Sequence, residues 1–446
     1  VYIAWLKNMF PQYQFTKTVR KPSLRTFHRL FFFLILLASL EAGSQGLLIP
    51  MDSAQTDHLR AYGVTYWALQ KPRVYKSEWL LNYRGGSFLI YEVNNSQRKA
   101  NMQGVTSVPV SNDQIDAIHQ EIEQGNMEVI PLEKAPQIAV YSPPNKEMWD
   151  DAVILALEYA KIPFDPIWDG EVLSGRLHQY DWLHLHHEDF TGQYGKFYRS
   201  FRTHAWYQEK VALSEAAARA AGFAKVQQHK GAVAQTIRNY VENGGFLFAM
   251  CAACDTLDIA LAAQGVDIVE SVLDGDGLTP GWQSKLDFSR CLAFQNFSLI
   301  PNPLIYEFSD IDTQPSPLTP GERYNADSFQ LFEFSAKFDP VPCMLNQNHS
   351  TKIMDFWGQT TAFRKSKLKP NVIVLADFPG DGVAKYIHGV VNQGTFTFLG
   401  GHDPEDPKHL VGEEDTDLSQ YPNSPGYRLI LNNVLFPAAK KKPRKT

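Results

Sequence analysis

Cysteine is scarce in this sequence, which has four cysteines among 446 residues. Four are too few for a scaffold built from disulfides, so a hydrophobic core has to stabilise the chain. A strong net charge is also missing, because the formal charge is -6 at pH 7 and no basic stripe interleaved with aromatic residues is present. The composition therefore excludes the small disulfide-rich class and argues against a nucleic-acid partner.

Near the N-terminus lies an apolar run, Leu30 to Leu40, that is shorter than the about 20 residues of a membrane-spanning helix. Small residues follow it at Ala42, Gly43 and Ser44. This layout is typical of a cleavable signal peptide, which we predict over residues 1–46. Because no cysteine comes directly after the run, we expect no lipid anchor. Removal of the signal would leave no membrane span, so we expect a periplasmic or secreted protein. Five basic residues precede the run, namely Lys17, Arg20, Lys21, Arg25 and Arg29.

The rest of the chain is predicted to be an α/β protein with two parts. Residues 47–134 contain a short strand, a helix and a strand-turn-strand unit, which predict a small N-terminal α/β lobe. Residues 135–436 alternate strands with helices, as in a parallel sheet covered on both faces. A proline-rich insertion is expected at about 270–370, and a basic tail at 437–446. The main strands are expected at 138–141, 162–167, 182–186, 246–250, 372–376 and 395–399, with the first of them followed by a helix at about 146–161.

Cys251 is the strongest candidate for a catalytic residue. It lies where a buried strand turns into a helix, with the small residues Ala249 and Ala253 on either side, as a nucleophile elbow requires. The amides that open the helix favour a thiolate there, and the Ala252 amide is placed to bind an oxyanion. The alternative is a small buried cysteine without function, and the Cys-x-x-Cys spacing to Cys254 leaves a redox or metal motif open.

A second polar cluster follows the strand at 182–186. On an extended strand His184, His186 and Glu188 share one face, so they offer ligands for a divalent metal. His187 and Glu188 are also candidates for binding a ligand or orienting a base at the sheet edge where open α/β sheets place their ligands. The alternative is a polar junction satisfied by the backbone.

A third cluster, Gly400-Gly-His-Asp-Pro-Glu-Asp406, follows the strand at 395–399. A catalytic cysteine needs a histidine within reach and a carboxylate that fixes it, and His402 with Glu405 or Asp403 offers both. The two glycines before His402 permit close approach of another backbone. A solvated acidic loop is the alternative.

Together the elbow at Cys251 and the later His402 and Glu405 resemble class I glutamine amidotransferases and their ThuA-like relatives. The resemblance covers about residues 137–260 and 372–436 and implies a flavodoxin-like, class I amidotransferase-like parallel sheet. In that family a glycine usually stands two residues after the cysteine and the histidine two before its glutamate. Here Ala253 takes the glycine position, and His402 stands three residues before Glu405.

The whole chain, including residues 79–88 and 182–190, also resembles a family from Bacteroidota commonly labelled asparagine synthetase B. That label implies transfer of the glutamine amide, although an N-terminal nucleophilic cysteine and an SGGxDS loop are absent. The sequence therefore predicts an exported Cys-His hydrolase of an amide or ester, without a cofactor. A non-catalytic protein that binds a small molecule, glycan or peptide is the alternative.

Overall fold

The computed structural model describes residues 44–145, 147–312, 328–339, 343–344, 347–354, 358–378, 382–406 and 411–440. Residues 1–43 of the predicted signal peptide and residues 441–446 of the predicted basic tail lie outside these residues, whereas residues 44–46 begin strand β1. Gln45–Thr446 form one compact unit. Among the residues that the structure describes, no helix has the length and apolarity needed to cross a membrane.

An antiparallel sheet of five strands is built from the first part of the chain, in the order β4-β1-β3-β2-β5. Three isoleucines of helix α5, at positions 115, 118 and 122, pack on one face of it because their spacing puts them on one side of the helix. Helix α3 packs with buried residues of the other face. The elements are β1 (Ser44–Ile49), α3 (His58–Leu69), β2 (Ser77–Leu81), β3 (Ser87–Ile90), α4 (Asn94–Met102), β4 (Val108–Ser111), α5 (Asn112–Gln124) and β5 (Glu128–Leu132).

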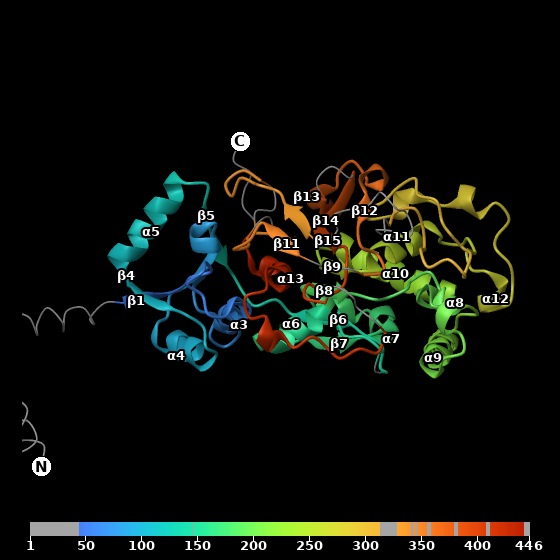
Figure 1. The fold of residues 1–446 in the computed structure, drawn as a ribbon, viewed down its shortest axis with the longest axis horizontal. Coiled ribbons are helices and arrows are strands. Elements are labelled where there is room, and N and C mark those ends of the chain that lie inside the picture. The colour runs from blue at the N-terminus through green and yellow to red at the C-terminus, as the bar shows by residue number, and fades with distance from the viewer. Residues whose placement is uncertain are drawn as a thin grey trace, which may run out of the picture. The chain divides into compact units, whose positions relative to one another are not determined.

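A second sheet has the order β11-β10-β13-β14-β15-β9-β8-β6-β7, with β12 paired to β14 (Figure 1). The five strands from β15 to β7 are parallel to their neighbours, whereas the strands from β11 to β15 pair antiparallel. The strands are β6 (Ile138–Tyr141), β7 (Asp165–Ile167), β8 (Trp182–Leu185), β9 (Phe246–Met250), β10 (Ser328–Leu331), β11 (Lys352–Met354), β12 (Phe363–Arg364), β13 (Ile373–Phe378), β14 (Val383–Val391) and β15 (Gly394–Leu399).

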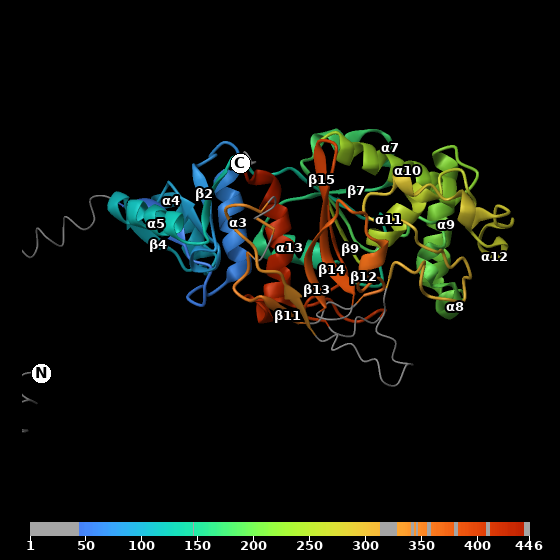
Figure 2. The ribbon, with the colours of Figure 1, turned by 90° about the horizontal axis from the view of Figure 1, so that it is seen from above.

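Both faces of the parallel strands are buried. In β9 the side chains of Phe246, Phe248 and Met250 join one core cluster, and those of Leu247 and Ala249 join the other. This alternation follows from the two-residue repeat of a strand. Figure 2 shows α13 on one side of the sheet and α10 and α11 on the other. The longer helices are α6 (Ala152–Ala160), α9 (Ala205–Ala220), α10 (Val226–Glu242), α11 (Ala253–Ala262) and α13 (Pro425–Leu435), and the short ones are α7 (Asp169–Leu173), α8 (Tyr198–Phe201) and α12 (Ser271–Asp274).

The predicted α/β class is confirmed, and so are the strands expected at 138–141 and 246–250. The finer expectation of a parallel, flavodoxin-like sheet is not confirmed, because the strands on the far side of β15 run antiparallel and the sheet as a whole is mixed. Strands β10 to β12 come from the proline-rich stretch and extend this sheet. The helix expected from about residue 146 begins only at Ala152, because the Asp151 side chain accepts hydrogen bonds from the Val153 and Ile154 amides and caps it.

Arg428 on α13 connects the two sheets through hydrogen bonds. Its side chain is fully buried and donates to the carbonyl oxygens of Met51, at 3.1 Å, and of Gly85. It also donates to the Tyr62 hydroxyl at 3.1 Å. These three acceptors belong to the part of the chain that forms the first sheet, whereas Arg428 belongs to a helix that covers the second sheet. One buried guanidinium group therefore satisfies three polar groups of the first part.

Candidate functional site

Three of the parallel strands end at one edge of the second sheet. In register, Leu185 of β8 pairs with Ala249 of β9, and Leu399 of β15 pairs with Met250 of β9. The residues that follow these strands therefore lie side by side. The Ala253 amide donates to the His186 carbonyl at 3.1 Å, and the Cys251 amide donates to the Gly401 carbonyl at 3.1 Å. This carboxyl edge is where parallel sheets bind their ligands.

Cys251 lies in the turn between β9 and α11. Its backbone φ is +49°, a left-handed conformation that is uncommon for a residue with a side chain. Ala249 and Ala253 on either side are fully buried, so small side chains are what the tight turn accommodates. Burial raises the pKa of the Cys251 thiol, while hydrogen bonds from the Thr360, Gln359 and Ala252 amides act to lower it. Cys251 and Cys254 are both buried thiols that form no disulfide with each other.

The glycines before His402 bring a second backbone against the thiol. A Cβ atom at Gly400 would lie 2.3 Å from the Thr361 carbonyl oxygen, so only glycine fits there. Gly401 has φ +91°, and its amide donates to the Thr360 carbonyl at 2.8 Å. Close packing at these two glycines thus holds residues 359–360, whose amides face the Cys251 sulfur.

Gly400→Ala is expected to destabilise the protein and to open the Cys251 site, because a backbone carbonyl has little freedom to move away from the new methyl group. We expect a loss of about 1–3 kcal/mol in unfolding free energy, as for other overpacked sites. Urea unfolding and the rate of reaction of Cys251 with a thiol reagent measure the two effects. Gly277→Ala is the control, because a Cβ atom there would meet nothing within 4 Å. Equal stability of Gly400→Ala and wild type would contradict the packing argument.

Histidines gather beside the elbow. The rings of His186 and His187 stack with their centroids 3.9 Å apart, and the His402 ring lies 4.4 Å from each of them. One ring nitrogen of each of the three lies within 4.8 Å of the others. His184 lies behind them, fully buried, and its Nδ1 donates to the Phe248 carbonyl at 3.1 Å.

Two aspartates that sequence reasoning missed contact these histidines. Asp151 Oδ1 lies 3.1 Å from His186 Nδ1 and 3.5 Å from His184 Nε2. Burial acts to raise the pKa of Asp151, but the charges of the two histidines hold it well below its usual value. The carbonyl oxygen of Asp150 lies 2.9 Å from His187 Nε2 and 3.0 Å from His402 Nε2.

Asp403, one of the two carboxylates expected to orient His402, has other contacts. Asp403 accepts hydrogen bonds from the Tyr427 hydroxyl at 2.6 Å and from the Glu405 amide at 2.8 Å. Asp150 comes closer to His402, with 4.0 Å between its Oδ1 and His402 Nδ1. The structure thus places Asp403 in the support of the loop and gives Asp150 the position next to the His402 ring.

Lys385 is a further site residue that sequence reasoning missed. It lies on β14, its side chain is fully buried, and its ammonium group donates to the Thr361 carbonyl at 2.9 Å. Burial lowers the pKa of Lys385 to about 7, although negative charge at Cys251 and Asp312 acts to raise it. A lysine that is readily neutral therefore lies within electrostatic reach of the candidate nucleophile.

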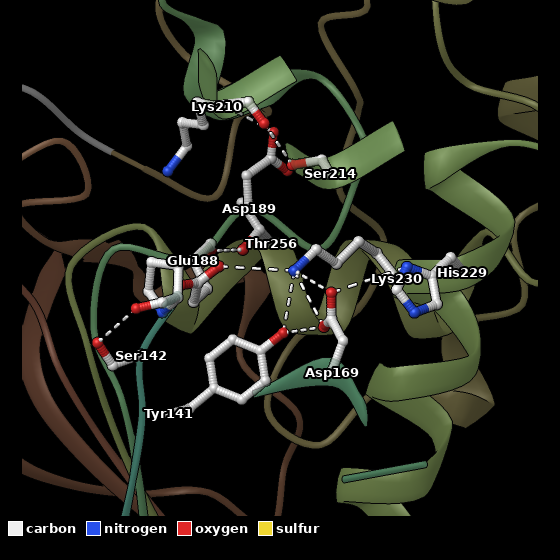
Figure 3. A network of polar contacts seen from close by, with 12 residues as sticks. Tyr141, Ser142, Asp169, Glu188, Asp189, Lys210, Ser214, His229, Lys230 and Thr256 are labelled. Atoms are coloured by element: carbon white, nitrogen blue, oxygen red, sulfur yellow. Dashed lines mark hydrogen bonds and ion pairs between the residues drawn. The ribbon is translucent and has the colours of Figure 1, made fainter. Parts of the chain in front are cut away.

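Glu188 belongs to a network centred on Lys230 of α10 (Figure 3). Lys230 Nζ lies 3.7 Å from Glu188, 3.1 Å from Asp169 and 2.9 Å from the Tyr141 hydroxyl. Burial raises the pKa of Glu188 to about 7. His184, His186 and Glu188 were expected to lie on one face of a strand. Strand β8 ends at Leu185, so the two-residue alternation of a strand does not continue to Glu188.

This Lys230 network borders a pocket at the same edge of the sheet. The pocket is lined by polar and aromatic side chains, among them Glu147, Trp168, Glu188, Lys210 and Lys230. Lys210 pairs with Glu147 at 2.9 Å. The volume of the pocket is about 30 Å³, which is room for one or two water molecules rather than for a glycan or peptide.

No family model matches the chain, and no curated protein matches it. Among solved structures, it is similar to two Salmonella typhimurium proteins described as Cytoplasmic Protein STM3548 and Cytoplasmic Protein STM1381. The first is 11% identical with a TM-score of 0.33, covering 69% of this chain and 100% of that one. The second is 12% identical with a TM-score of 0.29, covering 68% and 100%.

A third similar structure is Gan42B, a GH42 beta-galactosidase, at 10% identity and a TM-score of 0.25. The match covers 60% of this chain and 28% of the galactosidase. At such low TM-scores these likenesses establish neither the fold nor an activity of this chain.

Proposed function

We propose that the protein is a hydrolase that cleaves an amide or ester through a covalent intermediate on Cys251. The observation that carries the proposal is the conformation of Cys251, at φ +49° in a strand-to-helix turn, with three backbone amides directed at its sulfur. A left-handed conformation at such a turn is characteristic of a nucleophile elbow. The amides supply donors for negative charge on the sulfur or on a substrate oxygen.

We also infer a class I amidotransferase-like, flavodoxin-like arrangement for the parallel part of the second sheet. Numbered in chain order, the five parallel strands β6, β7, β8, β9 and β15 lie side by side as 2-1-3-4-5. That is the flavodoxin-like order, whose ligands bind at the carboxyl ends of the strands. The order supports the resemblance to glutamine amidotransferases and ThuA-like proteins without naming a substrate.

In this mechanism the Cys251 sulfur attacks the carbonyl carbon of the substrate, and the bond to the leaving nitrogen or oxygen breaks. Water then attacks the resulting thioester and releases the acid and the free thiol. Because burial raises the pKa of Cys251, the resting thiol keeps its proton at neutral pH. A base has to accept that proton as the sulfur attacks.

Two residues are candidates for this base. His402 follows Gly401, whose carbonyl accepts from the Cys251 amide. Lys385 is the second, because its pKa of about 7 leaves a fraction of the amine neutral at physiological pH. Removal of a general base typically lowers the rate about 10²–10⁴-fold, so the two variants His402→Ala and Lys385→Met identify which one acts.

The test is acylation by an activated ester. Wild-type protein given p-nitrophenyl acetate is expected to release a burst of nitrophenolate matched by one acetyl group on the Cys251 peptide. Cys251→Ala is expected to lose the burst, on the order of 10³-fold or more in rate. Cys254→Ala is the matched control, since it removes a buried thiol three residues away and should keep the burst. Glutamine is the first amide to test, because asparagine synthetase B-type amide transfer requires ammonia release from it.

An acetyl group on other residues with Cys251 unmodified would contradict the thiol mechanism. The remaining candidate is then a ligand-binding protein, for a glycan or peptide.

A further inference from the structure

The histidines beside the elbow present more lone pairs than protons can satisfy. The Asp150 carbonyl oxygen, His187 Nε2 and His402 Nε2 form a triangle with sides of 2.9, 3.0 and 3.0 Å. A carbonyl oxygen only accepts, and each ring nitrogen carries at most one proton. If both nitrogens donate to the oxygen, their two N–H groups face each other. If one nitrogen donates to the other, the accepting lone pair faces the carbonyl oxygen.

A cation that caps this triangle from one side satisfies all three sides, because each of its atoms then contributes a lone pair. For an ion with bonds of about 2.1 Å and ligands at right angles, neighbouring donor atoms are about 3.0 Å apart. The observed sides agree with that spacing.

His186 supplies a third imidazole. Its ring is 1% exposed, and its Nε2 has no hydrogen-bond partner among the residues that the structure describes. Its Nδ1 lies 3.1 Å from Asp151 Oδ1. A carboxylate beside one ring nitrogen is the usual device that leaves the other nitrogen deprotonated for a metal ion. The cap bonds that Asp151 accepts from the Val153 and Ile154 amides fix its position.

We propose that His187 and His402, with the Asp150 carbonyl as a third donor, bind one divalent first-row transition-metal ion, and that His186, oriented by Asp151, completes the site when its ring turns out of its stack on His187. Imidazole nitrogen favours zinc, cobalt, nickel or iron(II) over calcium and magnesium, which take oxygen ligands. His187 and Asp150 are half-buried, so the ion would be accessible from their side. This site goes beyond the proposed function, and a metal-bound His402 is no longer available as a base, which leaves that role to Lys385.

The experiment measures metal bound by the purified full chain after chelation and dialysis. Zinc and cobalt are added separately, excess ion is removed by gel filtration, and metal content is determined by elemental analysis. We expect about one ion per chain, d–d absorption bands for the cobalt form, and a melting temperature that rises with zinc concentration. His187→Ala and His402→Ala should each weaken binding at least about tenfold.

His388→Asn is the control, because His388 is an equally buried histidine of the same sheet whose Nδ1 pairs with Thr397 at 2.9 Å. It should bind metal as wild type does, which separates loss of a ligand from loss of folding. His187 is the safest ligand to remove, since it is half-buried and follows the end of β8. Failure of wild type to bind either metal, or undiminished binding by both ligand variants, would overturn the proposal. Cys251→Ala should bind metal normally, so the acylation and metal results can fail independently.

Discussion

Lys230→Met is expected to cost about 3–5 kcal/mol of unfolding free energy, one of the largest single-residue effects in this protein. Lys230 is 4% exposed and is the cation nearest to Asp169 and Glu188, which are themselves buried. Methionine matches the length of the side chain but removes the nearest compensating charge from two buried carboxylates. Urea unfolding followed by circular dichroism measures the loss.

Two further variants make this result specific. Lys230→Met combined with Asp169→Asn should recover part of the lost stability, because one of the uncompensated carboxylates becomes a neutral amide. Arg219→Met is the control for loss of a surface cation, since the Arg219–Glu215 pair is largely exposed and such pairs contribute little. A loss below about 1 kcal/mol for Lys230→Met would mean that water reaches the network and screens it.

Lys385→Met is expected to make the protein more stable than wild type at pH 6.5, with the advantage shrinking by about 2–3 kcal/mol at pH 9.5. The pKa of Lys385 is lowered by burial to about 7, from the 10.5 of an exposed lysine. Between these values the unfolded chain binds one more proton than the folded chain, so wild-type stability rises with pH across this window. Methionine does not titrate and removes that dependence.

The measurement is urea unfolding of wild type and Lys385→Met at the two pH values. Lys352→Met is the control, since Lys352 is exposed on β11 and its loss should leave the pH dependence unchanged. Loss of the Lys385 hydrogen bond to Thr361 lowers the stability of the variant equally at both pH values, so the difference between them isolates the titration. An equal effect of Lys385→Met at both pH values would mean that Lys385 stays charged when folded.

Much of the fold could be predicted from local patterns. The apolar runs at 138–141 and 246–250 became strands because the residues of both faces are buried. The pairing of β10 and β11 with this sheet could not be predicted, because both strands are short and lie in a proline-rich stretch whose pairing is set by tertiary contacts. The late start of α6 followed from one capping side chain, Asp151.

The same distinction applies to the candidate site, where some residues had a local sequence signal and others did not. The sequence pointed to Cys251 and His402 because each follows an apolar strand, and parallel strands bring their ends together. Lys385, Asp150 and the amides of residues 359–360 had no such signal. Lys385 lies inside a strand, and residues 359–360 reach Cys251 only through packing against the glycines 400–401. The Asp150-Asp151 pair before an apolar helix was the one available clue, as a helix-capping signal.

Because β15 comes late in the chain, the Cys251 thiol is exposed during synthesis for longer than it would be if its neighbouring strands were made early. β15 lies between β9 and β14, so a strand made almost last is inserted beside one completed 149 residues earlier, counted from Met250 to Leu399. Until it arrives, a growing chain has neither the Gly401 carbonyl nor the glycine contacts that close the elbow. Cys251, 3% exposed in the finished protein, is then open to oxidants. Oxidative damage at this residue should therefore accumulate in newly made chains rather than in mature ones.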